Sequence, residues 1–122
     1  MKNFDLEERT ARFGENVIQF CKQIRKDEVM RPLISQIVRS STSIGANYME
    51  ANAASSRKDF KNKIHICKKE AEETKHWLRM VVAADTNQSE KARLLWQEAQ
   101  ELTLIFGKIL STIRNSDLNR NS

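Results

Sequence analysis

The most informative part of this sequence is RSSTSIGANYMEA, residues 39–51. Small residues crowd this segment, yet apolar residues recur through and beside it at helical spacing, at Leu33, Ile37, Ile44 and Ala51. Ser and Gly are poor residues in a helix interior, where Gly costs about 1 kcal/mol relative to Ala. Small side chains on a buried stripe allow a neighbouring helix to approach closely. We therefore expect the closest helix–helix contact of the molecule at this segment.

The composition favours an all-α protein with a single domain spanning residues 1–122. Three Gly and one Pro are too few for the turns of a β-rich chain, and 30% of the residues are charged. No apolar run approaches the roughly 20 residues that span a bilayer. Residues 1–8 are charged and contain no apolar segment of the signal-peptide type. We therefore expect a cytoplasmic protein with no membrane partner.

Four segments carry apolar residues at alternating spacings of three and four. They predict helices at about residues 5–25, 32–54, 57–84 and 89–114. Asp5 with Glu8 predicts the start of the first helix, Pro32 the first turn of the second, and Ser56 with Asp59 the start of the third. Residues 115–122 are polar and predict a frayed tail. Four amphipathic helices with short connections predict an up-down-up-down four-helix bundle.

Several large apolar residues do not fit the inner faces of these helices. Ile66, Trp77 and Trp96 are the strongest examples. A monomer rarely leaves a large apolar patch in contact with water. We therefore expect self-association, with these three residues in the oligomer interface.

The sequence contains few candidates for catalytic or metal chemistry. Glu73 and His76 form a Glu-x-x-His pair, which is half of a di-iron carboxylate site. The only other histidine, His65, has Asn62 in the corresponding position, so we predict no metal or cofactor. No His or Lys neighbours the serines of residues 40–43 to activate a hydroxyl, and we predict no enzymatic activity.

The remaining polar and sulfur-containing candidates have structural explanations. Glu50, Glu70 and Glu73 predict a polar network between facing helices, with Arg39 as the cationic partner. Asn47 predicts a hydrogen bond across the bundle, because a buried amide needs a partner. Two widely separated cysteines are typical of reduced, partly buried thiols, and we expect neither a disulfide nor a metal role for Cys21 and Cys67.

The positive charge of the chain concentrates on the third predicted helix. The net charge is +5, and residues 56–84 hold eight Lys or Arg against four Asp or Glu. Basic residues follow one edge of this helix at helical spacing, interrupted by Glu72: they are Arg57, Lys58, Lys61, His65, Lys68, Lys75 and Arg79. Two interpretations stay open. The edge binds phosphates without reading bases, or it is a solvated face with ordinary intrahelical pairs.

Three segments carry a family resemblance: residues 41–51 (STSIGANYMEA), 56–60 (SRKDF), and 67–78, which includes ETKHWL. They resemble the bacterial four-helix-bundle family first found in intervening sequences of 23S ribosomal RNA genes, and the likeness spans residues 10–112. The resemblance implies a left-handed bundle that assembles as a ring-like homopentamer. The matching signature positions look architectural rather than catalytic: Ser43, Ile44, Gly45, Ala46, Asn47 and Glu50.

A relative in this family, the accessory protein of diversity-generating retroelements, implies possible partners. That protein works with a reverse transcriptase and binds nucleic acid through a basic surface. Our leading hypothesis is a non-enzymatic homo-oligomer that binds structured RNA through the edge formed by Arg57, Lys58, Lys61, Lys68, Lys75 and Arg79. The alternative is a scaffold for a protein partner that uses Trp77 or Trp96.

Overall fold

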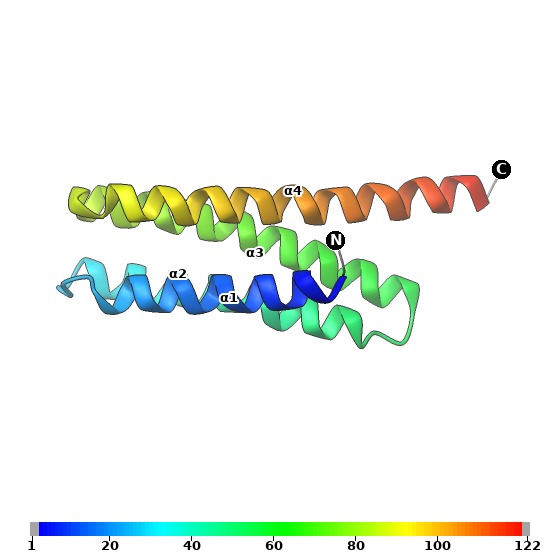
Figure 1. Cartoon of the computed structure of the whole chain (residues 1–122), viewed down its shortest axis with the longest axis horizontal. Helices are drawn as coiled ribbons and strands as arrows, with labels where there is room; N and C mark the ends of the chain where they lie inside the picture. Colours follow the sequence, from blue (N-terminus) through cyan, green and yellow to red (C-terminus); the bar gives the residue numbers. More distant parts are fainter. Residues whose placement is uncertain (1–2, 121–122) are drawn as a thin grey trace.

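The structure is a computed structural model that describes residues 3–120, with side chains from residue 6 onward. Four helices run antiparallel in sequence order (Figure 1): α1 (Asn3–Lys22), α2 (Met30–Asn52), α3 (Arg57–Ala84) and α4 (Ser89–Arg120). A short 3-10 turn, η1 (Thr86–Gln88), joins α3 to α4. Helices that follow each other in the chain lie side by side, and α4 closes the bundle against α1. The predicted all-α four-helix bundle is confirmed.

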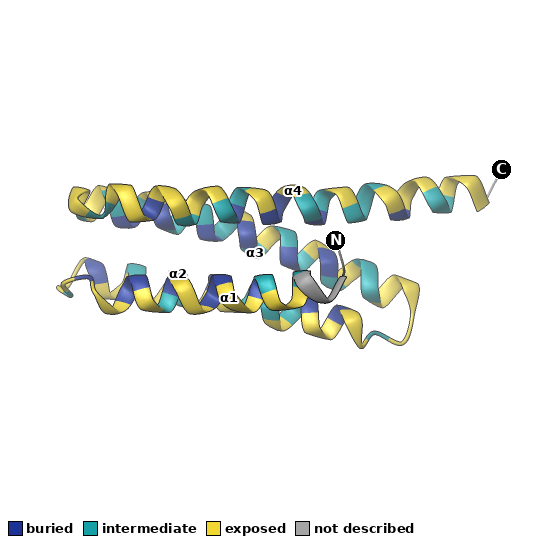
Figure 2. Ribbon diagram, in the orientation of Figure 1, coloured by how far each residue is buried: buried dark blue, intermediate teal, exposed yellow. Residues whose placement is uncertain are grey.

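The buried faces of the helices match the apolar spacing of the sequence (Figure 2). Phe13 and Val17 of α1, Ile44 of α2, Leu78 of α3 and Phe106 of α4 are all fully buried. They belong to one continuous cluster of core residues. At the outer edge, α1 and α4 are joined by the guanidinium of Arg9, which pairs with Glu98 at 2.7 Å and Glu101 at 2.6 Å. The core therefore forms where four apolar stripes meet.

Two facing glycines bring α1 and α2 close together. A Cβ atom on Gly45 would lie 3.4 Å from backbone atoms of Thr10 and Ala11. A Cβ atom on Gly14 would lie 3.5 Å from the Cα atom of Thr42. The expected close approach at residues 39–51 is confirmed, and its partner is α1. Gly14 was not predicted, although it supplies the second half of the contact.

The observed boundaries of α1 and α2 lie two or three residues from the predicted ones. α1 already includes Asn3 and ends at Lys22, so Asp5 lies within the helix and is not its first capping residue. After Lys22, backbone bonds from residue i to i−3 and the ammonium of Lys26, which donates to the carbonyl of Cys21 at 2.7 Å, terminate the helix. α2 begins at Met30, because the Asp27 carboxylate accepts from the N–H groups of Val29 and Met30, and it ends at Asn52 rather than at residue 54. Pro32 lies in its first turn, as predicted.

The remaining boundaries concern α3 and α4. α3 has the predicted bounds, and the hydroxyl of Ser56 accepts from the N–H of Asp59 at 3.0 Å, as expected for a capping serine. The predicted frayed tail is wrong for residues 115–120, which continue α4. An ion pair of 2.9 Å between Arg57 and Asp117 ties this last part of α4 to the start of α3. Residues 121–122 of the predicted tail lie outside the described part of the chain. In the described part, no helix has the length and apolar character needed to cross a membrane.

Candidate nucleic-acid interface

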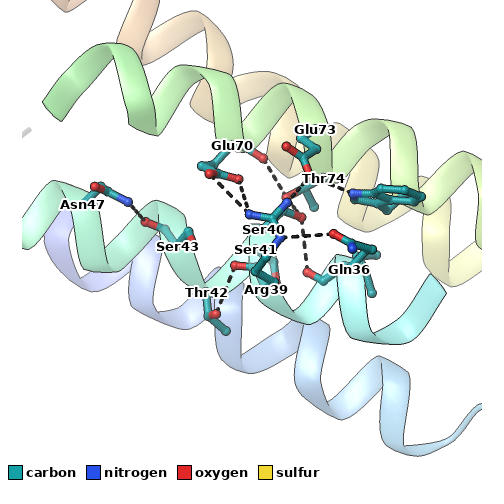
Figure 3. Close-up of polar contacts among 12 residues, drawn as sticks. Gln36, Arg39, Ser40, Ser41, Thr42, Ser43, Asn47, Glu70, Glu73 and Thr74 are labelled. Carbon is teal, nitrogen blue, oxygen red and sulfur yellow. Dashed lines mark hydrogen bonds and ion pairs between the residues drawn. The ribbon is translucent and has the colours of Figure 1, made fainter. Parts of the chain in front are cut away.

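The flank of α3 that faces α2 carries a closed network of charges (Figure 3). The guanidinium of Arg39 on α2 pairs with the carboxylates of Glu70, at 3.2 Å, and Glu73 on α3. Glu73 also accepts a hydrogen bond of 3.0 Å from the indole N–H of Trp77. This hydrogen bond and the charge of Arg39 lower the pKa of Glu73 below its ordinary value of 4.5. The predicted network is confirmed for Glu70 and Glu73, whereas Glu50 pairs with Lys63 at 2.7 Å.

The small polar residues of α2 serve packing on the same flank. The buried hydroxyls of Ser40 and Thr74 are hydrogen-bonded at 2.8 Å across α2 and α3, and Thr74 also donates to the carbonyl of Glu70. The amide of Asn47 donates to the carbonyl of Ser43 at 2.9 Å within its own helix. The predicted bond from Asn47 across the bundle is therefore wrong, because the side chain is only half-buried and the preceding turn offers an acceptor.

The six signature positions differ in how deeply they are buried. Ile44 is fully buried, Gly45 meets α1, and Ser43 and Asn47 lie half-buried. Ala46 and Glu50 are exposed.

The opposite flank of α3, which faces α4, carries the predicted basic edge. Arg57, Lys61, Lys68, Lys75 and Arg79 are spaced by four or seven residues and therefore form one line along the helix. Contacts with α4 place this line over the α3–α4 seam. Arg57 pairs with Asp117, and the ammonium of Lys75 donates to the amide oxygen of Gln100. Lys58 lies off the line, toward the exposed face of α3.

The basic edge is only partly neutralised. Within the described part of the chain, Lys58, Lys61, Lys68 and Arg79 have no hydrogen-bonding or ion-pair partner. The stem of Lys68 lies over α4, where a Cβ atom on Gly107 would be 3.7 Å from its Cε atom. Lysine stems pack on such surfaces while the ammonium stays in water. The edge is thus a row of basic residues, interrupted by the exposed Glu72, in which the described residues form no intrahelical ion pair.

Sequence reasoning missed the contribution of α4 to this surface. Arg93, Gln100, Gly107 and Arg114 recur every seven residues and share one line on α4. The contacts of Gln100 and Gly107 show that this line runs beside the basic edge. The seven-residue spacing of two arginines was the available signal. The antiparallel pairing of α3 with α4 therefore adds Arg93 and Arg114 to the basic surface.

The three residues predicted for the oligomer interface do not share one surface. Ile66 and Trp77 are eleven residues apart on α3 and lie on the flank that faces α2, where Trp77 contacts Glu73. Trp96 lies on α4, and the ammonium of Lys75 is 5.1 Å from its ring centroid. Because Lys75 and Trp77 are two residues apart, their side chains point to nearly opposite sides of α3.

The Glu73–His76 pair and the two cysteines are all held in hydrogen bonds or in packing. Glu73 is bound by Arg39 and Trp77, and the ring of His76 packs edge-on against Trp77 at 4.9 Å between centroids. The described residues contain no group of three or more His, Cys, Asp or Glu that could hold a metal ion. Both cysteines are buried and free, and burial raises the pKa of Cys21 to about 11 and of Cys67 to about 12. Neither thiol is therefore a nucleophile at neutral pH.

These features define an all-α bundle with a closed polar flank between α2 and α3 and a basic seam between α3 and α4. The family model of the 23S rRNA-intervening sequence protein matches residues 2–108, and the chain belongs to this family. A solved structure with a TM-score of 0.82 is a protein of unknown function from the S23 ribosomal protein family of Bacteroides thetaiotaomicron. It is 31% identical, and the likeness covers 91% of this chain and 99% of that one. No curated protein matches the chain.

Proposed function

We propose that this protein is a non-enzymatic, homo-oligomeric binding protein for structured RNA. The observation that supports it best is the basic seam: cations from α3 and α4 lie along one surface, and several have no acidic partner in the described residues. A row of this kind contacts phosphates without reading bases, and its affinity depends strongly on salt. Membership of a family named after ribosomal RNA genes is consistent with an RNA partner. A reverse transcriptase as an additional partner stays a prediction.

The oligomer in this proposal is a ring, for which the family resemblance implies five subunits. Large apolar residues reach the surface on two unlike faces: Ile66 and Trp77 are half-buried on the α2-facing flank of α3, and Leu94 and Leu104 of α4 are 59% and 61% exposed. Two different faces that contact each other give a head-to-tail assembly rather than a two-fold dimer, and this assembly is a ring where the rotation between subunits closes. Repetition of one weak site around such a ring increases the overall affinity through avidity.

Charge reversal tests the RNA proposal. Lys58→Glu with Lys61→Glu removes two unpartnered cations near the start of α3, where Glu is compatible with the helix terminus. The matched control is Arg25→Glu with Arg31→Glu, which changes the net charge equally at exposed positions in and beside the α1–α2 connection, outside α3 and α4. We expect the first variant to bind a structured RNA about tenfold more weakly at low salt, with a shallower salt dependence. The control should bind RNA like the parent protein.

Fluorescence anisotropy with a labelled RNA hairpin measures both effects, and circular dichroism checks helix content. Equal losses in both variants, or no RNA binding by the parent protein at low salt, would remove the proposal. Light scattering on each sample reports the subunit number, and Ile66→Glu should reduce it. The alternative function, a scaffold for a protein partner, is favoured by Trp96, which is 41% exposed. A purified complex that keeps a second protein after nuclease treatment would support this alternative.

A further inference from the structure

A groove lies between α3 and α4 at the end of the seam nearest η1. It encloses about 290 Å³, and its floor is apolar, formed by Leu78 and Val82 of α3 with Ala92 of α4. Its rim carries Arg79, Arg93 and Trp96. The volume is at the small end of ligand pockets, which run from about 300 to about 1,000 Å³. The groove therefore has room for one flat ring system and is too small for a large ligand.

The rim combines an aromatic surface with unpaired positive charge. Trp96 is 41% exposed although it is held beside α3 by the ammonium of Lys75. Arg79 and Arg93 are both exposed, and neither has a partner among the described residues. No acidic residue lines the groove. An occupant with a flat apolar body and flanking negative charge is complementary to this rim.

The groove continues the basic edge. Arg79 is the last cation of the line that begins at Arg57, and Arg93 belongs to the matching line of α4. An RNA backbone that follows the row of cations therefore reaches the groove at its end. Exposed aromatic rings beside arginines are the usual platform for unpaired bases, since every base has a face that stacks.

We propose that this groove holds one unpaired nucleobase of the bound RNA. The base lies against Trp96 and the apolar floor, and the phosphates on either side contact Arg79 and Arg93. This inference rests on the proposed RNA-binding function and adds a preference to it. The basic edge binds any phosphate backbone, whereas the groove favours an RNA with an unstacked base.

The test uses the full chain and two RNAs that share one duplex, one fully paired and one with a single bulged nucleotide. Trp96→Leu keeps an apolar side chain but removes the stacking surface. We expect Trp96→Leu to weaken binding of the bulged RNA about tenfold, close to the loss measured for one stacked base. Binding of the paired RNA should be unchanged. Circular dichroism and thermal unfolding verify that the bundle is intact.

Fluorescence provides a second measurement that does not depend on affinity. Trp77→Phe leaves Trp96 as the single reporter, and Trp96→Phe leaves Trp77. The bulged RNA should quench the emission of Trp96 more than the paired RNA does, and it should leave Trp77 unchanged.

The outcomes separate this inference from the function on which it rests. Suppose that Lys58→Glu with Lys61→Glu weakens the binding of both RNAs. If Trp96→Leu then weakens the binding of neither RNA, or weakens the binding of both equally, the groove assignment is overturned and the basic edge stands. If the parent protein binds neither RNA at low salt, the RNA-binding function itself is overturned. Quenching of Trp96 by an acidic amphipathic peptide, with none by the bulged RNA, would assign the groove to a protein partner instead.

Discussion

Charged residues and one tryptophan lie along each flank of α3, Trp77 on α3 itself and Trp96 on the neighbouring α4, yet the two flanks differ in how these groups are paired. On the flank facing α2, Arg39 pairs with Glu70 and Glu73 (Figure 3), and the indole of Trp77 donates to Glu73. On the flank facing α4, Arg79 has no partner in the described residues and Trp96 is 41% exposed. The first arrangement holds the bundle together. The second leaves charge and aromatic surface available for a ligand.

The same contrast appears in how closely the helices meet. Ser40 is fully buried against α3 and hydrogen-bonds to Thr74. Gly107 of α4 would meet only the flexible end of Lys68 if it carried a Cβ atom. The α2 flank is therefore limited by side-chain volume, whereas the α4 flank has room to spare. Three substitution pairs test this difference, all at one fixed protein concentration because self-association affects apparent stability.

The largest effect is expected from a change of volume. Ser40→Leu inserts a large side chain where the helices are in contact and removes the bond to Thr74, so it should lower the free energy of unfolding by about 2–3 kcal/mol. Gly107→Ala, the control on the other flank, should raise it by about 0.5–1 kcal/mol through better helix propensity. Urea unfolding followed by circular dichroism measures both. A Ser40→Leu protein as stable as the parent would contradict close packing on the α2 flank.

Sequence reasoning predicted the architecture well because the buried apolar residues of a helix recur at regular spacing. The seams through Phe13, Ile44, Leu78 and Phe106 follow directly from spacings of three and four, and all four residues are buried. Boundaries were harder to predict because they depend on single hydrogen bonds. The Asp27 carboxylate accepts from the N–H of Met30, the first residue of α2, although Asp27 lies five residues before Pro32 and outside the apolar pattern. Likewise, the pairing of Asp117 with Arg57 extends a helix through a segment without apolar periodicity.

The candidate site was predicted only in half, because a surface seam belongs to two helices. The periodic row from Arg57 to Arg79 was visible in one stretch of sequence. Arg93 and Trp96 join it only through the antiparallel register of α3 and α4. A sequence shows which face of a helix a residue occupies, but it does not show which residue of the next helix lies opposite.

The second test replaces a charged arginine by the apolar side chain of methionine. Arg39→Met leaves the carboxylate of Glu70, whose side chain is only 13% exposed, without its cation. Because Arg39 itself is partly exposed, we expect a loss of about 1 kcal/mol in unfolding free energy. Arg79→Met, the matched change on the α4 flank, should alter stability by less than about 0.5 kcal/mol. RNA affinity should show the reverse order, with a loss for Arg79→Met alone. Equal stability losses at both positions would show that the two flanks do not differ.

The smallest expected effect concerns pH. The hydrogen bond from Trp77 and the charge of Arg39 lower the pKa of Glu73 below 4.5, so the folded protein releases this proton more readily than the unfolded chain. The contribution of Glu73 to stability is therefore fully present above pH 4.5 and is lost as the pH falls through the folded pKa. Glu73→Gln should flatten this part of the pH profile by less than about 1 kcal/mol, because the carboxylate is partly exposed.

Glu72→Gln is the control, since Glu72 is exposed and has no partner in the described residues. Urea midpoints measured between about pH 6 and about pH 3 follow the loss. Identical pH profiles for the two variants would mean that the contacts of Glu73 with Arg39 and Trp77 add no more stability than the exposed Glu72 does.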